Sequence, residues 1–170
     1  MRDLTRTNAR MPAYRMLSEL GFEVFTPMKQ RRSVVAGRRV SQEVPFIHDL
    51  LFVCSSRRLL DPVVERIRTL QYRYVFGGYC EPMVVPTSDM ERFIAAVRSS
   101  AESVRYYRAE EITASMYGSR VRISGGCFDG YEGHLLSLRG SKYKRLIVEF
   151  PNLFTAAVRL DDEMIEVLED

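Results

Sequence analysis

Apolar and polar residues recur along this chain with two different periods, and these periods predict where its helices and strands lie. In the first hundred residues, three stretches repeat their apolar positions every three or four residues, which is the spacing of an amphipathic helix. These stretches are 13–20, 63–70 and 90–97. Gly21 is a typical helix end, and Asp61 with Pro62 and Ser88 are typical helix starts. We therefore expect three helices in this half.

Apolar stretches between the expected helices predict strands at 22–28, 44–53 and 72–76. Residues 29–39 contain five cations, no acid and a central Ala36-Gly37, which indicates a basic hairpin that projects from the body. A solvated charged loop is the alternative for this stretch. The alternation of strands and helices favours an α+β fold in which helices cover a small sheet.

The last fifty residues read as five short strands, at 120–124, 135–138, 146–150, 156–160 and 164–168. Glycines dominate the connection between the first two strands, and Phe128 is its only large apolar side chain. We expect Phe128 to fold back as a plug, and Gly133 to stand where a side chain would obstruct a close approach. Five short strands of this kind predict a small closed or nearly closed barrel.

Between the two halves the apolar pattern dissolves, so we expect domains at 1–105 and 117–170 joined by a linker at 106–116. No long apolar run suggests a membrane span or a signal peptide, and the expected location is the cytoplasm. The cysteines Cys54, Cys80 and Cys127 lack the spacing of a zinc site or a disulfide framework. We read them as plain thiols.

Charge is distributed unevenly along the chain. Residues 1–105 carry a net charge of +6 and residues 106–170 a net charge of −3. Arginine supplies 22 of the 25 cations, and arginine is the better bidentate ligand for phosphate. The first half is therefore the part that suits a polyanionic partner.

Two stretches of the sequence resemble a known family. The run Val121-Arg-Ile-Ser-Gly-Gly-Cys-Phe-Asp-Gly-Tyr-Glu-Gly133 is similar to the KOW motif of SH3-like barrels in ribosomal proteins and NusG-type elongation factors. The runs Leu20-Gly-Phe-Glu-Val-Phe-Thr-Pro27 and Met83-Val-Val-Pro-Thr-Ser-Asp-Met-Glu-Arg-Phe-Ile94 resemble the NusG N-terminal (NGN) domain. The resemblance implies an NGN α/β sandwich, a small mostly antiparallel sheet flanked by helices, followed by a five-stranded SH3-like KOW β-barrel. Gly125, Phe128, Gly130 and Gly133 would be structural residues of the KOW motif.

The sequence departs from the family pattern at two places. Ile47-His-Asp-Leu50 stands where NusG and RfaH proteins have Phe-Pro-Gly-Tyr or Phe-Pro-Asn-Tyr. This form is closer to the specialised NusG paralogues of Bacteroides-type bacteria, which act on capsular polysaccharide operons. Family members also open their first strand with Trp-Tyr or Trp-Phe, whereas this chain starts beyond that point, with either a shortened strand or a start placed too late.

The resemblance implies control of transcription elongation. In this family the NGN sheet presents an apolar patch to the clamp helices of the largest RNA polymerase subunit, which favours processive elongation. By position the patch here would comprise Leu50, Phe52, Tyr74 and Phe76. The alternative is that these four are ordinary core residues.

The resemblance also suggests contacts with the non-template DNA strand. The candidate side chains are Arg6, Arg10, Arg15, Arg31, Arg32 and Arg73. Such contacts would be mostly to phosphates, and therefore sensitive to salt. The KOW domain would be a separate docking module for a ribosomal protein or a termination factor.

Two other classes of function are open to the sequence. A ribosome-binding or RNA-binding KOW protein would use the cations Arg139, Lys142, Lys144 and Arg145, although the net charge of the second half disfavours RNA. An enzyme is disfavoured because His48 and His134 fall in different expected domains, and no cysteine has an evident base. We expect no enzymatic activity, no cofactor and no metal.

Overall fold

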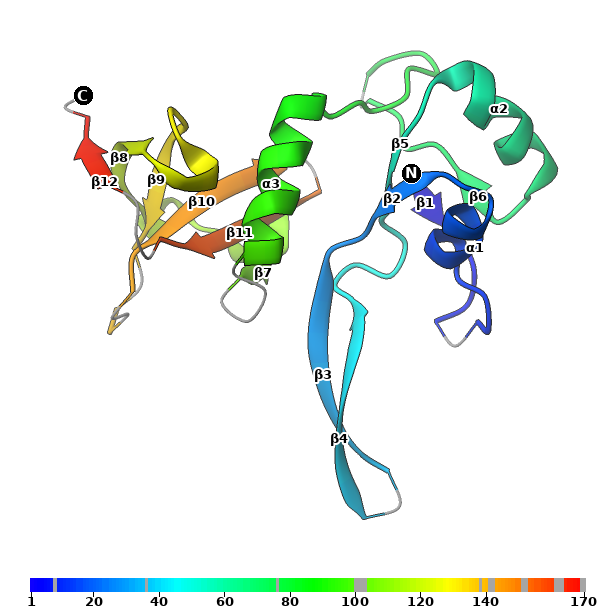
Figure 1. The fold of residues 1–170 in the computed structure, drawn as a ribbon, viewed down its shortest axis with the longest axis horizontal. Coiled ribbons are helices and arrows are strands. Elements are labelled where there is room, and N and C mark those ends of the chain that lie inside the picture. Colours follow the sequence, from blue (N-terminus) through cyan, green and yellow to red (C-terminus); the bar gives the residue numbers. More distant parts are fainter. Residues whose placement is uncertain are drawn as a thin grey trace. The chain divides into compact units, whose positions relative to one another are not determined.

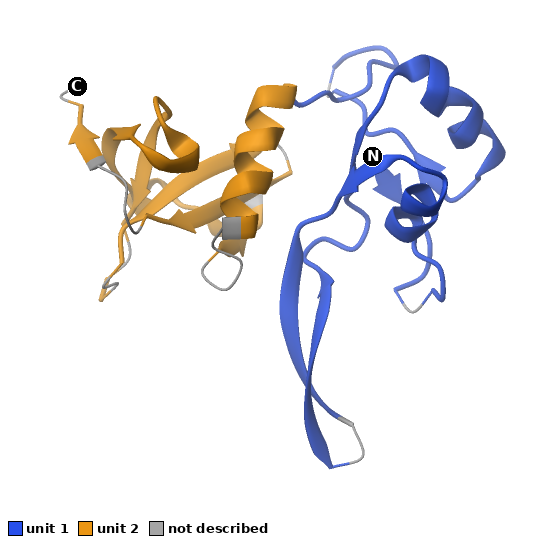
Figure 2. Ribbon diagram, in the orientation of Figure 1, with its two compact units in different colours: residues 1–85 blue, residues 86–170 orange. Residues whose placement is uncertain are grey.

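The computed structural model describes residues 1–7, 9–35, 37–75, 77–99, 104–137, 139–140, 143–150, 153–160 and 164–168. The chain divides into two compact units, residues 1–85 and residues 86–170, which Figure 2 distinguishes by colour. Figure 1 labels the helices and strands of both units. Each unit has its own buried apolar residues and is described by itself.

The first unit is built from short antiparallel strand pairs and two helices (Figure 1). β1 pairs with β6, β2 with β5, and β3 with β4. In chain order its described elements are β1 (Arg2–Asp3), α1 (Ala13–Glu19), β2 (Glu23–Phe25), β3 (Met28–Val35), β4 (Arg38–Pro45), β5 (Phe52–Cys54), α2 (Arg57–Arg66) and β6 (Leu70–Gln71).

One face of the β2–β5 pair packs against the helices. Ala13 and Leu17 of α1 are buried together with Leu51 and Leu70. The partly buried side chains around this cluster are Met1, Met16, Phe22, Val24, Val53, Val63, Val64 and Ile67. These residues come from both strands and from both helices, so the amphipathic stripe of each helix has the partner that its periodicity implies.

A buried carboxylate fixes the start of α1. Pro12 precedes the helix and its side chain makes no capping hydrogen bond. Instead the carboxylate of Asp3, which is 3% exposed, accepts the backbone N–H of Ala13 at 2.8 Å and that of Thr5 at 2.9 Å. Asp3 thus satisfies one of the donors that every helix leaves open at its N-terminus, and it ties β1 to α1.

Three expected elements of the first unit differ from the structure. The expected strand at 44–53 is divided, because β4 ends at Pro45 and the N–H of Leu50 donates to the carbonyl of Ile47 in a turn before β5. The expected helix start at Asp61 is also wrong, since α2 begins at Arg57 and contains Pro62. Asp61 does not cap the helix, and its carboxylate binds Arg57 at 2.7 Å and the Tyr72 hydroxyl at 2.6 Å. The segment expected as a strand at 72–76 contributes one isolated bridge, Tyr74 to Pro82.

The second unit is a helix on a six-stranded antiparallel sheet with the order β12-β8-β9-β10-β11-β7. Its described elements are α3 (Thr87–Ser99), β7 (Arg105–Tyr107), β8 (Tyr117–Ser124), β9 (Glu132–Leu136), β10 (Arg145–Phe150), β11 (Phe154–Arg159) and β12 (Met164–Val167), with short 3-10 turns at Ala109–Glu111, Ala114–Met116 and Gly126–Phe128. The five strands expected from the sequence correspond to β8–β12, and β7 adds a sixth. Among the described residues, no pairing joins the two ends of this sheet, β12 and β7.

The two compact units divide between residues 85 and 86, and the expected domains at 1–105 and 117–170 stay a prediction. The reason for this division is the packing of α3, whose Phe93 is completely buried with its ring centroid 4.6 Å from that of Phe150 in β10 and 5.9 Å from that of Phe154 in β11. The expected linker at 106–116 also begins inside β7, which pairs with β11. The apolar stripe of α3 was visible in the sequence, but the stripe alone does not identify the surface that it covers.

Replacing Phe93 tests this packing. We expect Phe93→Ala to destabilise the second unit by about 3–5 kcal/mol, because a large aromatic side chain is lost from a packed core. Hydrogen exchange read by mass spectrometry should become faster in β10 and β11 and stay unchanged in α1 and α2. Glu91→Ala, at an exposed position of the same helix, should leave both units unchanged. Faster exchange confined to α1 and α2 would contradict the observed packing.

Candidate functional site

The side of the β2–β5 pair that faces away from the helices carries aromatic residues. Val24 and Val53 are opposite each other and pack toward α1 and α2, so their neighbours Phe25 and Phe52 lie on the other face. The ring centroids of Phe25 and Phe52 are 6.4 Å apart. We call this side of the first unit the aromatic face.

The structure separates the four residues expected to bind the polymerase. Phe52 is half-buried on the aromatic face, whereas Leu50 is 2% exposed and belongs to the core. Tyr74 is 51% exposed, and its ring packs edge-on against Tyr72 with centroids 6.4 Å apart. Phe76 lies outside the described residues.

Sequence reasoning did not single out several other apolar side chains of the first unit. Phe25 is the cross-strand neighbour of Phe52, and its alternation with Val24 was the available signal. The segment after β6 also exposes Val75, Tyr79 and Val84, with Tyr79 98% exposed. Exposed apolar side chains concentrated in one segment are the usual mark of a protein-binding surface.

The Ile47–Leu50 turn holds the N-terminal segment in place. The Asp49 carboxylate lies 3.2 Å from the Arg2 guanidinium and 3.0 Å from that of Arg73. The His48 Nε2 atom is 2.7 Å from the carbonyl oxygen of Thr5. Of the arginines expected to touch DNA, Arg73 is therefore engaged within the protein, and its side chain is only 23% exposed.

The other five expected DNA contacts are exposed, but they come from two different elements. Arg6 and Arg10 precede α1, and Arg15 lies on it with its guanidinium 5.8 Å from the centroid of the Tyr14 ring. Arg31 and Arg32 are consecutive residues of β3, so their side chains point to opposite faces of the strand.

In the second unit, the glycine-rich connection after β8 closes over Phe128, which is 1% exposed and packs against the Tyr131 ring at 5.6 Å between centroids. Gly125 has a φ of +101° and Gly130 a φ of +72°, a backbone region that disfavours other residues. Gly133 serves differently, because a Cβ atom there would come within 3.0 Å of Tyr131 and 3.2 Å of Leu146.

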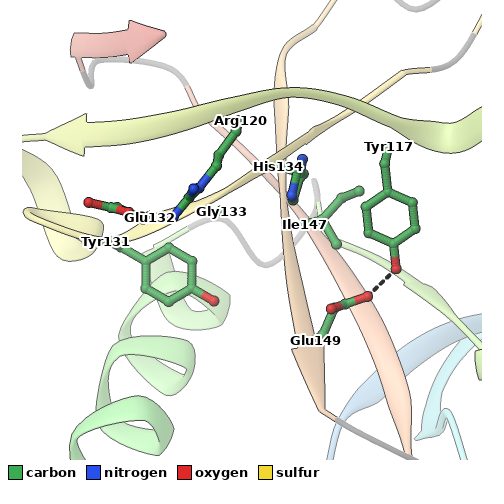
Figure 3. Close-up of a pocket in the computed structure, with 8 residues that line it drawn as sticks. All are labelled: Tyr117, Arg120, Tyr131, Glu132, Gly133, His134, Ile147 and Glu149. Carbon is green, nitrogen blue, oxygen red and sulfur yellow. Dashed lines mark hydrogen bonds and ion pairs between the residues drawn. The ribbon is translucent and has the colours of Figure 1, made fainter. Parts of the chain in front are cut away.

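A pocket of about 230 Å³ opens on the second unit beside Gly133 (Figure 3). It is lined by Tyr117, Arg120, Tyr131, Glu132, Gly133, His134, Ile147 and Glu149. The Tyr117 hydroxyl donates to Glu149, which raises the pKa of Tyr117, and Arg120 lies 3.1 Å from Glu132. His134 Nδ1 lies 3.2 Å from the Gly118 carbonyl oxygen. Tyr117, Arg120 and His134 are thus bonded to neighbours in the unit, and none of these bonds forms a nucleophile–base pair.

The described residues offer few other groups that could bind a ligand or react. Cys54, Cys80 and Cys127 are free thiols. Within the part of the chain that the structure describes, no three His, Cys, Asp or Glu side chains gather where they could hold a metal ion. No described helix combines the length and the apolar composition needed to cross a membrane. Two surface features remain as candidates: the aromatic face and the exposed arginines.

Comparison with known protein families finds one family model that matches the chain. The family model described as "Transcription termination factor nusG" matches residues 4–94, more than half of the chain. The matched region includes both helices of the first unit and the aromatic face. A comparison with curated proteins finds no match.

Because Gly133 lies so close to Tyr131 and Leu146, a larger residue at this position should destabilise the second unit. Gly133→Val should destabilise the second unit by about 1–3 kcal/mol, because its side chain must displace Tyr131 or Leu146 from a filled space. Urea unfolding followed by tyrosine fluorescence measures the loss. Ser119→Val places the same side chain at an exposed position of the adjacent strand β8 and should change stability by less than about 0.5 kcal/mol. Equal losses in the two variants would show that the close approach at Gly133 does not limit stability.

Proposed function

The chain belongs to the NusG family of transcription elongation and termination factors, and from this membership we propose that it binds RNA polymerase and promotes processive elongation. The match over residues 4–94 is the observation that carries the proposal. Members of this family are transcription factors without enzymatic activity, and on this membership we propose none for this chain.

The aromatic face is the proposed contact with the polymerase. Its partner would be the clamp helices of the largest subunit, since exposed helices can lay apolar side chains on an apolar sheet surface. Half-buried Phe52 and exposed Tyr74 are the proposed contacts, with Phe25 beside Phe52. Leu50, also in the expected set, is buried in the core. Phe76, outside the described residues, stays in the proposed set by its position in the sequence.

Exposed arginines before and on α1 are proposed to touch the non-template DNA strand. Arg6, Arg10 and Arg15 are exposed and lie within one short segment. Arg73 is a weaker candidate, because Asp49 already neutralises much of its charge. Contacts of this kind act mainly on phosphates and carry little sequence information.

The second unit is proposed to be a KOW module that docks a ribosomal protein or a termination factor. The alternative of an RNA-binding module gains little from the structure, because Arg145, one of the cations that suggested it, is 7% exposed. The others that lie among the described residues, Arg139 and Lys144, are exposed. Lys142 lies outside the described residues.

The proposed targets are polysaccharide biosynthesis operons. This part of the proposal rests on the form of the Ile47–Leu50 segment and on the run Val85-Pro-Thr-Ser-Asp-Met90, which resemble the specialised NusG paralogues. The place of action would be the cytoplasm, where the polymerase works.

Retention of host RNA polymerase by the tagged protein tests the proposal. Wild type should retain the polymerase, and Phe52→Glu with Tyr74→Glu should reduce retention at least about tenfold, because a carboxylate would be buried against an apolar surface. Leu50 is left unchanged because a charge in the core would unfold the unit. Leu59→Glu is the matched control, since Leu59 is 63% exposed on α2, and it should bind like wild type.

Circular dichroism must first show that all three proteins are folded. No retention by wild type and Leu59→Glu would overturn the polymerase assignment. Equal retention by all three would keep the polymerase as a partner and would move the contact away from the aromatic face.

A further inference from the structure

The β3–β4 hairpin extends from the rest of the first unit as a twisted two-stranded ribbon (Figure 1). Gly37, with a φ of +76°, lies in the turn at its tip. The ribbon carries the cations Lys29, Arg31, Arg32, Arg38 and Arg39, and Glu43 is its only acid. All five cations are exposed.

The strand register sorts these charges onto two faces, because residues directly opposite each other in an antiparallel pair lie on the same side. Arg31 is opposite Gln42, and Val35 is opposite Arg38. The first face, called the Lys29 face, consists of Lys29, Arg31, Ser33, Arg38, Val40, Gln42 and Val44. The second, called the Arg32 face, consists of Met28, Gln30, Arg32, Val34, Arg39, Ser41, Glu43 and Pro45.

The two faces differ in their charge balance and in the hydrogen bonds and ion pairs that their polar side chains form. On the Arg32 face, the Ser41 hydroxyl donates to Gln30 at 2.9 Å, and Glu43 supplies a negative charge. The Lys29 face has three cations and no acid. Lys29 lies over the Phe46 ring at 5.2 Å, but neither Arg31 nor Arg38 forms an ion pair with any residue that the structure describes.

A ribbon face with like charges and no acid has a positive potential that an anionic partner would neutralise. Lys29 and Arg31 are two residues apart, or about 7 Å, and Arg38 lies opposite the residue six positions beyond Lys29, or about 20 Å away along the strand. A span of about 20 Å corresponds to roughly six base-pair steps of B-DNA at 3.4 Å each. The spacing therefore suits an extended row of phosphates.

The composition of the ribbon favours duplex over single-stranded nucleic acid as its partner. Proteins that bind single strands stack the bases on aromatic side chains, and residues 29–45 contain no aromatic residue. The major groove of B-DNA is wide enough to admit a two-stranded β-ribbon. The strong twist of a two-stranded ribbon also lets one face follow a helical groove.

We propose that the Lys29 face of the hairpin binds the phosphates of duplex DNA. The partner rests on the proposed function, because an elongation factor on RNA polymerase works beside duplex DNA. The surface is separate from the aromatic face and from the arginines near α1. The proposal assigns different roles to two neighbouring arginines: Arg31 contacts the duplex, and Arg32 does not.

Two double variants with the same change in charge test this assignment. Arg31→Ala with Arg38→Ala removes two cations from the Lys29 face, and Arg32→Ala with Arg39→Ala removes two from the Arg32 face. Binding of the full chain to a fluorescein-labelled 20-base-pair duplex is followed by anisotropy, starting at low salt. The slope of log K against log salt should fall in magnitude by about 1.8 in the first variant, since each phosphate contact contributes about 0.9. Affinity at 0.1 M salt should fall at least about tenfold, and the second variant should match wild type.

Three outcomes would overturn the proposal. Equal losses in the two variants would mean that net charge, not one face, binds DNA. No loss in the first variant would exclude the hairpin. Tighter binding of the labelled single strand than of the duplex, with the same loss in the first variant, would replace the duplex with a single strand. None of these measurements contains polymerase, so they are independent of the retention experiment, in which the first variant should behave like wild type.

Discussion

The alternation of side chains across paired strands is the constraint on which the surfaces of the first unit depend. In β2 and β5 it turns Val24 and Val53 toward the helices and leaves Phe25 and Phe52 on the opposite side. In β3 and β4 it places Arg31 and Arg32 on different faces. A slip of one residue in either register would move every side chain of that strand to the other face. The packing of Val24, Val53 and Leu51 against α1 and α2 therefore also fixes where the aromatic residues point.

Two acidic side chains, Asp3 and Asp49, hold the N-terminal segment against the rest of the first unit. Asp3 accepts hydrogen bonds from two backbone groups and links β1 to α1, while Asp49 lies between Arg2 and Arg73. The Asp3 carboxylate is buried, so its hydrogen bonds contribute more than the partly exposed ion pairs of Asp49. The Ile47–Leu50 segment, which departs from the common family pattern, thus has a structural use. Its Asp49 engages an arginine that the sequence alone suggested as a DNA contact.

The sequence predicted local features well and their tertiary partners poorly. The helical stripes of 13–20 and 90–97, the basic hairpin and five strands of the second unit follow from periodicity and turn residues. Periodicity could not show that α3 packs with Phe150 and Phe154, because an apolar stripe fits any apolar surface. Asp61-Pro62 resembled a helix start, but Asp61 is bonded to Arg57 and Tyr72 inside a helix that had already begun. Of the candidate site, the sequence suggested Phe52 and Tyr74, and their role stays a prediction. The alternation of Phe25 with Val24 was visible in the sequence, but the pairing of Phe25 with Phe52 came only from the strand register.

The aromatic face and the Lys29 face would respond differently to their surroundings, and this difference bears on processivity. An apolar contact with the polymerase depends little on salt, whereas phosphate contacts weaken steeply as salt rises. Phosphate contacts are also independent of sequence, which allows a protein to move along DNA without a barrier at each base pair. A factor anchored to the polymerase by apolar contacts and to the duplex by non-specific charge would therefore travel with the enzyme. Any preference for particular operons would have to come from other contacts, because apolar contacts with the polymerase and contacts with phosphates carry no base-sequence information.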